Sequence, residues 1–226
     1  MENDVLRQGP LFNALDDEAA NALRASMTES RLRRGETLFH EGDSGDKLYI
    51  VTEGKVKLGR TSADGRENLL AILGPGQMFG ELSLFDPGPR SATVTAVTDA
   101  SFASLSHEDL LRWLEGRPVV ARGLLAQLAG RLRKANDVVA DLVFSDVPGR
   151  VAKALLDLAD RFGRTADDGV HVHHDLTQEE LAQLVGASRE TVNKALADFA
   201  SRAWLRLDGK SVIILDPERL ARRARV

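Results

Sequence analysis

The chain contains no cysteine among its 226 residues. This absence excludes disulfide bonds, iron–sulfur clusters, thiolate zinc sites and cysteine nucleophiles together. A chain without cysteine is compatible with a reducing compartment, and we expect a cytoplasmic protein.

Long apolar runs are also missing from the sequence. No stretch approaches the roughly 20 residues that a membrane-spanning helix needs. The first residues, MENDVLRQG, are polar and acidic, unlike those of a signal peptide. We therefore expect no membrane partner. No catalytic triad or P-loop is recognisable, so we do not expect an enzyme.

The chain has no excess of basic charge, because its formal net charge is −4 at pH 7. DNA binding requires a local basic face and not a basic chain, so the net charge neither supports nor excludes a nucleic-acid partner. Local basic residues are present: the sequence ends in ERLARRARV, and Arg189 and Lys194 fall on one short predicted helix.

Short β-like runs alternate with turn signals between Gly35 and about Ser106. Turns at intervals of roughly 8–12 residues predict an antiparallel barrel or roll, and Asp64-Gly65 is typical of a tight hairpin. A structureless glycine-rich linker is excluded because the intervening runs are too apolar and too regular. The runs are ETLFH, KLYIVTEG, KVKLGR, ENLLAIL, SATVTAV and SFASL.

Helical periodicity is expected on both sides of this region. Residues 10 to 27 predict a helix, with Asp16 and Asp17 as cap candidates. A second, long helix is predicted to begin at Pro118 and to carry an apolar stripe. Periodicity alone leaves open whether that helix packs on its own domain or pairs with a second copy. The stripe comprises Leu124, Leu125, Leu128, Leu132, Val139, Leu142 and Val143.

The pair Ser145-Asp146 is the expected hinge between domains. Asp146 can cap a new helix that tolerates Pro148 in its first turn and runs to Phe162. A turn from Gly163 through TADDG, a short strand VHVHH and, near the end, the two strands LRLDG and KSVIILD are expected beyond it.

The segment LTQEELAQLVGASRETVNKALADF predicts a helix-turn-helix. Thr177 and Glu180 can form a capping box, Gly186 allows the sharp turn, and Ser188 can cap the second helix. Apolar residues form the inner faces of both helices: Leu181, Leu184, Val185, Val192, Leu196 and Phe199.

The outer face of the second helix carries side chains that can read bases. Arginine can bind guanine O6 and N7 bidentately, glutamate can accept from cytosine N4, and lysine can contact guanine or phosphate. A hairpin around Asp208-Gly209 would supply a wing. An αα-hairpin with a solvated charged face is the alternative, but cap, turn and apolar faces agree with DNA binding. The outer residues are Arg189, Glu190, Asn193 and Lys194.

The segment FGELSLFDPGPRSA predicts a ligand site. Residues 80–85 can form one helical turn whose N–H groups bind an anion, while Arg90 offers a planar fork for phosphate and Ser91 a hydroxyl. Glu81 is expected to face a neutral donor such as a ribose 2′-OH. These residues describe a cyclic ribonucleotide, but a buried Arg–Glu ion pair that only staples the roll remains an alternative.

Two metal hypotheses are weaker. The histidines 171, 173 and 174 have no cysteine or evident acidic partner for zinc, so surface strand histidines are the preferred interpretation. A cupin-type enzyme would need several ligands inside the roll, where His40 is the single histidine between residues 35 and 106. We expect no metal site.

Nearly the whole chain resembles the cyclic-AMP receptor proteins of the CRP/FNR family, most closely the actinobacterial members. The likeness is carried by GASRETV, GDKLYIVTEGKVKL, FGELSLFDPGPRSA, DGRENLL and DVPGRVA. The resemblance implies an α+β protein with a jelly-roll-like, cyclic-nucleotide-binding β-roll over residues 1–117. A dimerisation helix and hinge over 118–145 and a winged helix-turn-helix over 146–226 would follow.

The resemblance also implies ligands and partners. Cyclic AMP is the expected effector, with cyclic GMP possible, and a homodimer would bind double-stranded DNA at a TGTGA-N6-TCACA-like palindrome and meet RNA polymerase. The phosphate-binding cassette of the family matches Gly80, Glu81, Leu82, Arg90 and Ser91, Arg131 matches a position near the ligand, and Ala135 and Asn136 align with the base-contacting positions. Arg189, Glu190 and Lys194 match the three base-reading positions, and Thr177, Ser188 and Asn193 are further DNA-binding candidates.

One position departs from the family pattern. The long helix usually offers a threonine and then a serine, threonine or asparagine to the adenine amino group, and an ungapped count places Ala135 and Asn136 there. Ala135 cannot donate or accept a side-chain hydrogen bond.

Two alternative functions remain open from the sequence. One is a DNA-binding regulator that needs no nucleotide or responds to another one. The other is a nucleotide-sensing module with a degenerate helix-turn-helix.

Overall fold

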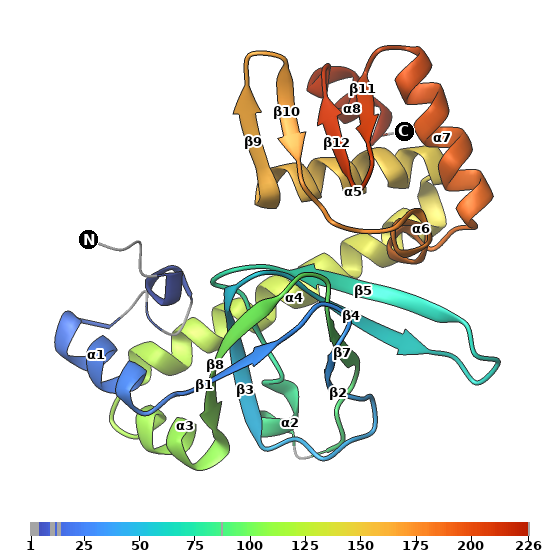
Figure 1. Cartoon of the computed structure of the whole chain (residues 1–226). Coiled ribbons are helices and arrows are strands. Elements are labelled where there is room, and N and C mark those ends of the chain that lie inside the picture. Colours follow the sequence, from blue (N-terminus) through green and yellow to red (C-terminus); the bar gives the residue numbers. More distant parts are fainter. Residues whose placement is uncertain (1–4, 10–11, 13–14, 87, 226) are drawn as a thin grey trace. The chain divides into compact units, whose positions relative to one another are not determined.

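The computed structural model describes residues 5–9, 12, 15–86 and 88–225 (Figure 1). The chain forms two compact units. The first comprises residues 1–60 and 70–133, and the second comprises residues 61–69 and 134–226. Within the described residues, no helix is both long and apolar enough to cross a membrane.

Two four-stranded antiparallel sheets build the predicted roll. One has the order β1-β8-β3-β6 and the other β2-β7-β4-β5. The Asp64-Gly65 turn joins β4 to β5, with Gly65 at φ +81° as a tight turn requires. The strands are β1 (Thr28–Leu32), β2 (Thr37–Phe39), β3 (Lys47–Glu53), β4 (Val56–Thr61), β5 (Glu67–Leu73), β6 (Met78–Phe79), β7 (Thr93–Ala96) and β8 (Ala100–Ser106).

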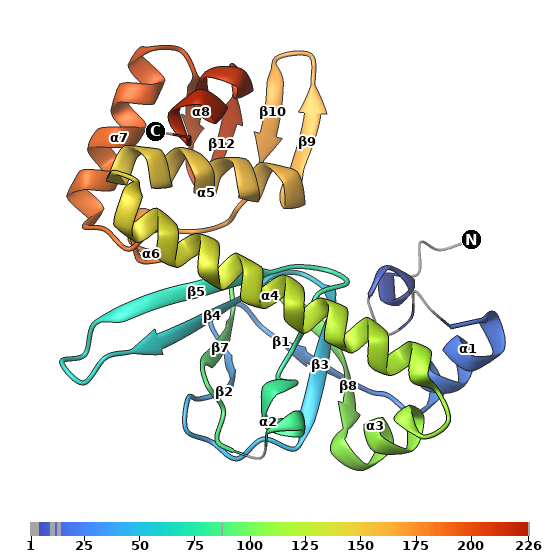
Figure 2. The same ribbon diagram turned by 180° about the vertical axis from the view of Figure 1, so that it is seen from behind.

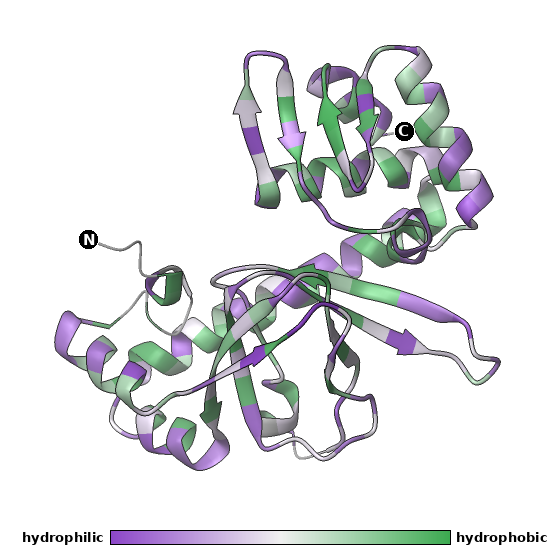
Figure 3. Cartoon of the chain, in the orientation of Figure 1, coloured by the Kyte–Doolittle hydropathy of each residue, from purple (hydrophilic) through white to green (hydrophobic). Residues whose placement is uncertain are grey.

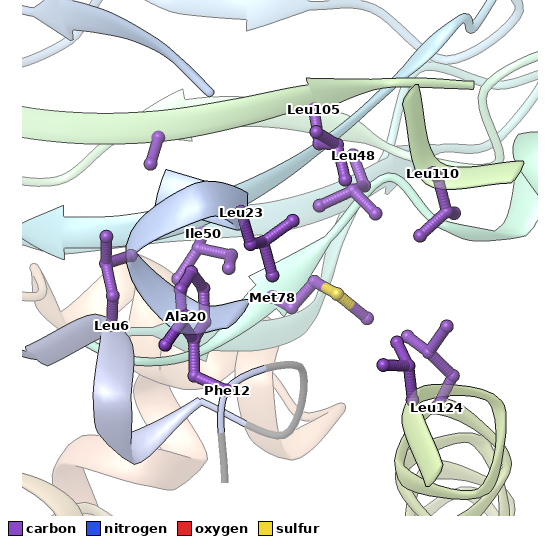
Figure 4. Packing of buried hydrophobic residues seen from close by; sticks show 12 residues of the cluster. Leu6, Phe12, Ala20, Leu23, Leu48, Ile50, Met78, Leu105, Leu110 and Leu124 are labelled. Carbon is purple, nitrogen blue, oxygen red and sulfur yellow. The ribbon is translucent and has the colours of Figure 1, made fainter. Parts of the chain in front are cut away.

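Strand β3 explains how one sheet serves two hydrophobic clusters. Leu48 and Ile50 belong to one cluster, while Tyr49 and Val51 belong to the other, because alternate side chains of a strand point to opposite faces. The second cluster also contains Phe79 and residues of the facing sheet, and therefore fills the roll. The first cluster is covered by helices (Figure 4).

Within the described residues, five helical segments accompany the roll. The predicted helix over residues 10–27 is shorter than expected: it begins after its cap Asp16, and residues 10, 11, 13 and 14 lie outside the described chain. Figure 2 shows the last of the five as a single continuous helix. They are η1 (Val5–Gln8), α1 (Asp17–Ala25), α2 (Leu82–Phe85), α3 (His107–Leu114) and α4 (Pro118–Phe144).

The apolar stripe of α4 changes its surroundings along the helix. Val120 and Leu124 are buried in the helix-covered cluster, so the first turns pack on the roll's own unit. The following apolar side chains are exposed within the single chain: Leu125, Leu132, Val138, Val139, Leu142, Val143 and Phe144.

Among its described residues, the second unit contains the sheet β11-β12-β10-β9, the end of α4 and the helices that follow it. Figure 3 shows β12 as hydrophobic along most of its length, and its three apolar residues are buried in this unit's interior. The elements are α5 (Val147–Phe162), β9 (Gly163–Ala166), β10 (Gly169–Val172), α6 (Gln178–Val185), α7 (Arg189–Ser201), β11 (Leu205–Asp208), β12 (Ser211–Ile214) and α8 (Pro217–Arg223).

Candidate effector pocket and DNA interface

An open pocket lies in the first unit, bordered by β2, β4, β6, α2, β7 and α4. Several residues of the predicted ligand segment line it together with side chains from distant elements. Those that matter below are Phe39, Glu81, Leu82, Arg90, Ser91 and Arg131.

Arg90 is a buried cation in this pocket, with 5% of its surface exposed. Its Nη1 donates to the carbonyl of Gly80 at 2.8 Å and to Ser83 Oγ at 3.1 Å. Its Nη2 donates to the carbonyl of Lys47 at 2.9 Å. Among the described residues no carboxylate lies within ion-pair distance of Arg90, although carboxylates act on it at longer range. Its buried Nε has no hydrogen-bond partner.

Burial lowers the pKa of Arg90, because removal from water disfavours its charged form. A guanidinium nevertheless stays protonated in proteins. The pocket thus holds a cation whose hydrogen-bond acceptors are all neutral. Its face lies near the rings of Phe39 and Tyr49, and one N–H has no acceptor. An anion that accepts from this N–H fits the site, and a cyclic phosphate is such an anion.

Glu81 is also buried, with 1% of its surface exposed. Its Oε1 accepts from Arg131 Nη1 at 2.5 Å, and Arg131 also donates to the carbonyl of Met78. The Arg–Glu ion pair considered as an alternative is therefore present, but it joins Glu81 to Arg131 and not to Arg90. The second oxygen, Oε2, has no partner, so it can accept from a ligand hydroxyl.

The remaining residues of the ligand segment shape the pocket. Gly80 has φ +80°, and a Cβ there would lie 2.8 Å from Arg90 Nη1, so both backbone and space require glycine. Leu82 and Ser91 are exposed pocket-lining residues. Ala135 and Asn136 are exposed on α4 and do not line the pocket, so their contact with a base stays a prediction.

The helix-turn-helix is built from α6 and α7. Thr177 Oγ1 accepts from the Glu180 amide at 3.1 Å, and Glu180 Oε2 accepts from the Thr177 amide at 2.8 Å, which completes the predicted capping box. Gly186 has φ +65° in the turn. Ser188 Oγ accepts from the Thr191 amide at 3.2 Å and caps α7, as expected.

The first two turns of α7 present Arg189, Glu190 and Lys194 to solvent. Lys194 Nζ lies 2.7 Å from Glu190 Oε1, an exposed pair one turn apart that costs little to exchange for base contacts. Asn193 differs from the expected outer position because it is half-buried, and its Oδ1 is buried without a partner. The inner residues Val192, Leu196 and Phe199 are buried as predicted.

Comparison with known proteins finds a matching domain for each of the two regions. Residues 29–117 match the model of the cyclic nucleotide-binding domain, and residues 149–223 match the Crp-like helix-turn-helix domain. A CRP-like cAMP-activated global transcriptional regulator of Mycobacterium tuberculosis is 55% identical over 223 residues, which are 99% of this chain and 100% of that protein.

The chain belongs to the CRP/FNR family. It is a transcription regulator and not an enzyme. Thermus thermophilus catabolite activator protein is 38% identical, with a TM-score of 0.56 over 96% of this chain and 98% of that one. The c-di-GMP responsive global regulator CLP of Xanthomonas campestris is 27% identical, with a TM-score of 0.76 over 88% of this chain and 99% of that one.

Sequence reasoning missed one residue of this CRP/FNR regulator that links the hinge to the turn before α7. Arg150 Nη1 donates to the carbonyl of Ser145 at 2.8 Å. The same side chain donates to the carbonyls of Val185 at 2.9 Å and Gly186 at 3.2 Å. No local pattern could have revealed these contacts, because the partners lie up to 36 positions away in sequence.

The predicted hinge residue Asp146 has two roles in the CRP/FNR chain. Its Oδ1 accepts from the Gly149 amide at 2.9 Å and caps α5, while its Oδ2 accepts from Arg223 of α8 at 2.5 Å. The hydrogen bond from Arg223 and then that from Gly149 hold the pKa of Asp146 below its usual range.

The histidines considered for zinc, His171, His173 and His174, do not line the effector pocket. His171 contacts Asp168 at 2.5 Å, and Arg206 contacts the other oxygen of that carboxylate at 2.6 Å. Hydrogen bonds from His171 and then Arg206 lower the pKa of Asp168. In the part of the chain that the structure describes, no group of three or more histidine, cysteine, aspartate or glutamate residues is placed to hold a metal.

Proposed function

We propose that this regulator binds cyclic AMP in the β-roll and that nucleotide binding controls how a homodimer recognises DNA. The observation that carries the proposal is the buried Nε–H of Arg90, which has no acceptor, in the same pocket as the open oxygen of Glu81. A ligand with one anionic group and one nearby hydroxyl satisfies both groups. A cyclic ribonucleotide has this combination in its phosphate and its ribose 2′-OH.

Each pocket residue has a defined task in this proposal. Arg90 would donate Nε–H to the cyclic phosphate, and Glu81 Oε2 would accept from the 2′-OH. Arg131, already paired with Glu81, brings α4 to the ligand. The Mycobacterium tuberculosis relative is named as cAMP-activated, which supports adenine as the base, and cyclic GMP stays possible.

Calorimetry with cyclic AMP on the full chain and on Arg90→Leu tests this assignment. The wild type should bind, and the variant should show no measurable binding while circular dichroism reports an unchanged fold. Unaltered affinity in Arg90→Leu would place the pocket elsewhere and overturn the assignment.

The dimer is supported by the apolar repeat on α4. Exposed Leu125, Leu132 and Val139 recur at seven-residue steps, and half-buried Leu128, exposed Ala135 and exposed Leu142 occupy the intervening positions. This a/d repeat is the pattern of a helix that pairs with another helix. A second copy of the same chain would cover it.

DNA recognition is assigned to α7. Arg189, Glu190 and Lys194 would read a TGTGA half-site, with Thr177, Ser188 and Asn193 around them. Because a twofold dimer presents two recognition helices, the expected site is the TGTGA-N6-TCACA-like palindrome. Repacking at α4 would reorient the DNA-binding domains about Ser145-Asp146. In the cytoplasm, the DNA-bound dimer would then contact RNA polymerase.

Fluorescence anisotropy on that palindrome and on a scrambled duplex of equal length tests the DNA assignment. We expect tighter binding to the palindrome at one fixed salt concentration, since non-specific affinity depends steeply on salt. Equal affinity for both duplexes would instead favour a nucleotide-sensing module with a degenerate helix-turn-helix.

A different effector is the second candidate, and one observation favours it. Ala135 lacks the hydroxyl that the adenine site of the family usually offers. The Xanthomonas campestris relative is named as c-di-GMP responsive, so effector choice varies within the fold. Parallel titrations with cyclic AMP, cyclic GMP and cyclic di-GMP distinguish these effectors, and tightest binding of either guanine nucleotide would support this candidate.

A further inference from the structure

We infer that Phe39 is a positioning residue for Arg90 and that its ring sets the affinity of the effector pocket for an anionic ligand. The inference rests on the proposed nucleotide function and adds a residue that the ligand motif does not contain. Phe39 lies on β2, about 50 positions before Arg90, and lines the same pocket.

The ring of Phe39 lies over the guanidinium. Arg90 Cζ is 4.3 Å from its centroid, against 5.7 Å for the ring of Tyr49. Phe39 is itself held by aromatic neighbours, with centroids 5.9 Å from Tyr49 and 6.2 Å from Phe79. The ring is therefore a fixed platform and not a mobile side chain at the pocket mouth.

The aromatic contact solves a problem that an ion pair would not. A buried cation needs stabilisation, but a carboxylate partner would neutralise Arg90 and occupy its N–H groups. An aromatic face attracts the cation through its quadrupole without accepting any of the in-plane hydrogen bonds. Phe39 thus stabilises the buried charge and leaves Nε–H available for an anion.

The space around the same guanidinium supports a fixed orientation. A Cβ at Gly45 would lie 2.7 Å from Arg90 Nε and 2.4 Å from Ser83 Oγ. Gly45 does not have a positive φ, so the backbone does not demand glycine there. The closeness of Arg90 is therefore the physical reason why residue 45 is glycine. If the guanidinium shifted away from the Phe39 ring, it would collide with the backbone of Gly45 or lose its hydrogen bonds to the carbonyls of Gly80 and Lys47.

The test measures cyclic AMP affinity by calorimetry and the melting temperature of the ligand-free protein for four full-length variants. Phe39→Leu should weaken binding roughly 2- to 30-fold, the range expected for a desolvated cation–π contact. Phe39→Tyr keeps an aromatic face and should restore affinity to within about twofold of the wild type. Phe39→Met, flexible and apolar, should behave like Phe39→Leu and repeats the test if leucine packs poorly.

Leu38→Ala is the matched control. Leu38 lies next to Phe39 on β2 and packs on the same core cluster, but it does not line the pocket. It should lower the melting temperature and leave the affinity unchanged. Equal affinity in the leucine, methionine and tyrosine variants of Phe39, or an equal loss of affinity in Leu38→Ala, would overturn the inference. A wild type that does not bind cyclic AMP would instead contradict the proposed function.

Discussion

Two buried side chains of opposite charge, Arg90 and Glu81, differ in the groups that contact them in the effector pocket. Arg90 is held by carbonyls, a hydroxyl and a ring, and no carboxylate pairs with it among the described residues. Glu81 has a cationic partner on one oxygen and none on the other. Each therefore retains unused hydrogen-bonding capacity, and a ligand that satisfies both avoids the cost of leaving buried polar groups unpaired.

At Ala135 we predict that a hydroxyl can be restored. Ala135→Thr should tighten cyclic AMP binding by roughly 0.5–1.5 kcal/mol, about two- to tenfold, because a neutral hydrogen bond contributes that amount. The gain in affinity for cyclic AMP should exceed the gain for cyclic GMP, because the exocyclic amino group of guanine is at a different ring position. Calorimetry measures both, with Asn136→Ala as the opposite change. Unchanged affinities for both nucleotides would show that the departure from the family pattern is silent.

At Arg189 we predict a base contact. Arg189→Ala should cost roughly 1–3 kcal/mol on the palindrome and relax specificity at one guanine per half-site. Anisotropy with single-base variants of the duplex measures the effect. A loss of equal size on the scrambled duplex would make Arg189 a phosphate contact instead.

The types of residue in the pocket could be predicted from the sequence, but not their partners. Gly80, Glu81 and Arg90 lie in one short segment whose chemistry indicates an anion and a hydroxyl. Arg131 is 50 positions from Glu81, and nothing local shows that they meet. Asn193 was expected on the outer face of α7, but helical spacing does not resolve a residue at the boundary between the two faces.

Among the elements, the long helix α4 has an apolar face without a partner in the single chain. Burial ends after Leu124, whereas the heptad pattern continues to Leu142. Such a contiguous exposed stripe indicates an interface.

We predict that Leu132→Glu dissociates the dimer at micromolar concentration, because two carboxylates would face each other in the helix pair. Leu132 is 64% exposed in the single chain, so the substitution should leave the fold of each protomer intact. Arg133→Glu, on the neighbouring position of the same helix, is the control. Sedimentation measures the mass, and a wild-type monomer or a dimeric Leu132→Glu protein would contradict the assignment.

The contribution of the α5 cap Asp146 to folding stability is expected to depend on pH. The pKa of Asp146 is depressed in the folded protein, so its contribution is present above the unfolded value of about 3.9 and is lost as the pH falls through the folded pKa. Its side chain is 58% exposed, so the contribution should stay below about 1 kcal/mol. Urea unfolding from pH 6 down to about pH 3 should show a smaller loss of stability for Asp146→Asn than for the wild type. An equally steep loss in both proteins would contradict this role.

Caps made α1, α5, α6 and α7 predictable, since Asp16, Asp146, Thr177 and Ser188 all accept from backbone amides of the first helical turn. The short helix α8 was missed, although Asp216 caps it. Strands without a clear apolar alternation were missed. β1 reads TESRL, and β6 has only two residues. β9 was interpreted as part of a turn because GRTA has no apolar pattern, and its pairing with β10 defines it as a strand.

For the whole molecule, the central claim is that nucleotide in the roll changes the affinity of α7 for DNA. Such coupling requires two sites and a shared element with two arrangements. The helix α4 and the hinge at Ser145-Asp146 are the elements assigned to this task. Arg150 contributes a physical link, since it binds carbonyls at the hinge and at the turn before α7.

The most direct test titrates the TGTGA-N6-TCACA duplex with wild type and Arg90→Leu, each with and without saturating cyclic AMP. For the wild type, cyclic AMP should tighten DNA binding by roughly 5- to 150-fold, the usual range of an allosteric coupling. Arg90→Leu should show no enhancement at the same nucleotide concentration. Wild-type DNA affinity that is identical with and without cyclic AMP, or an equal enhancement in Arg90→Leu, would contradict the account.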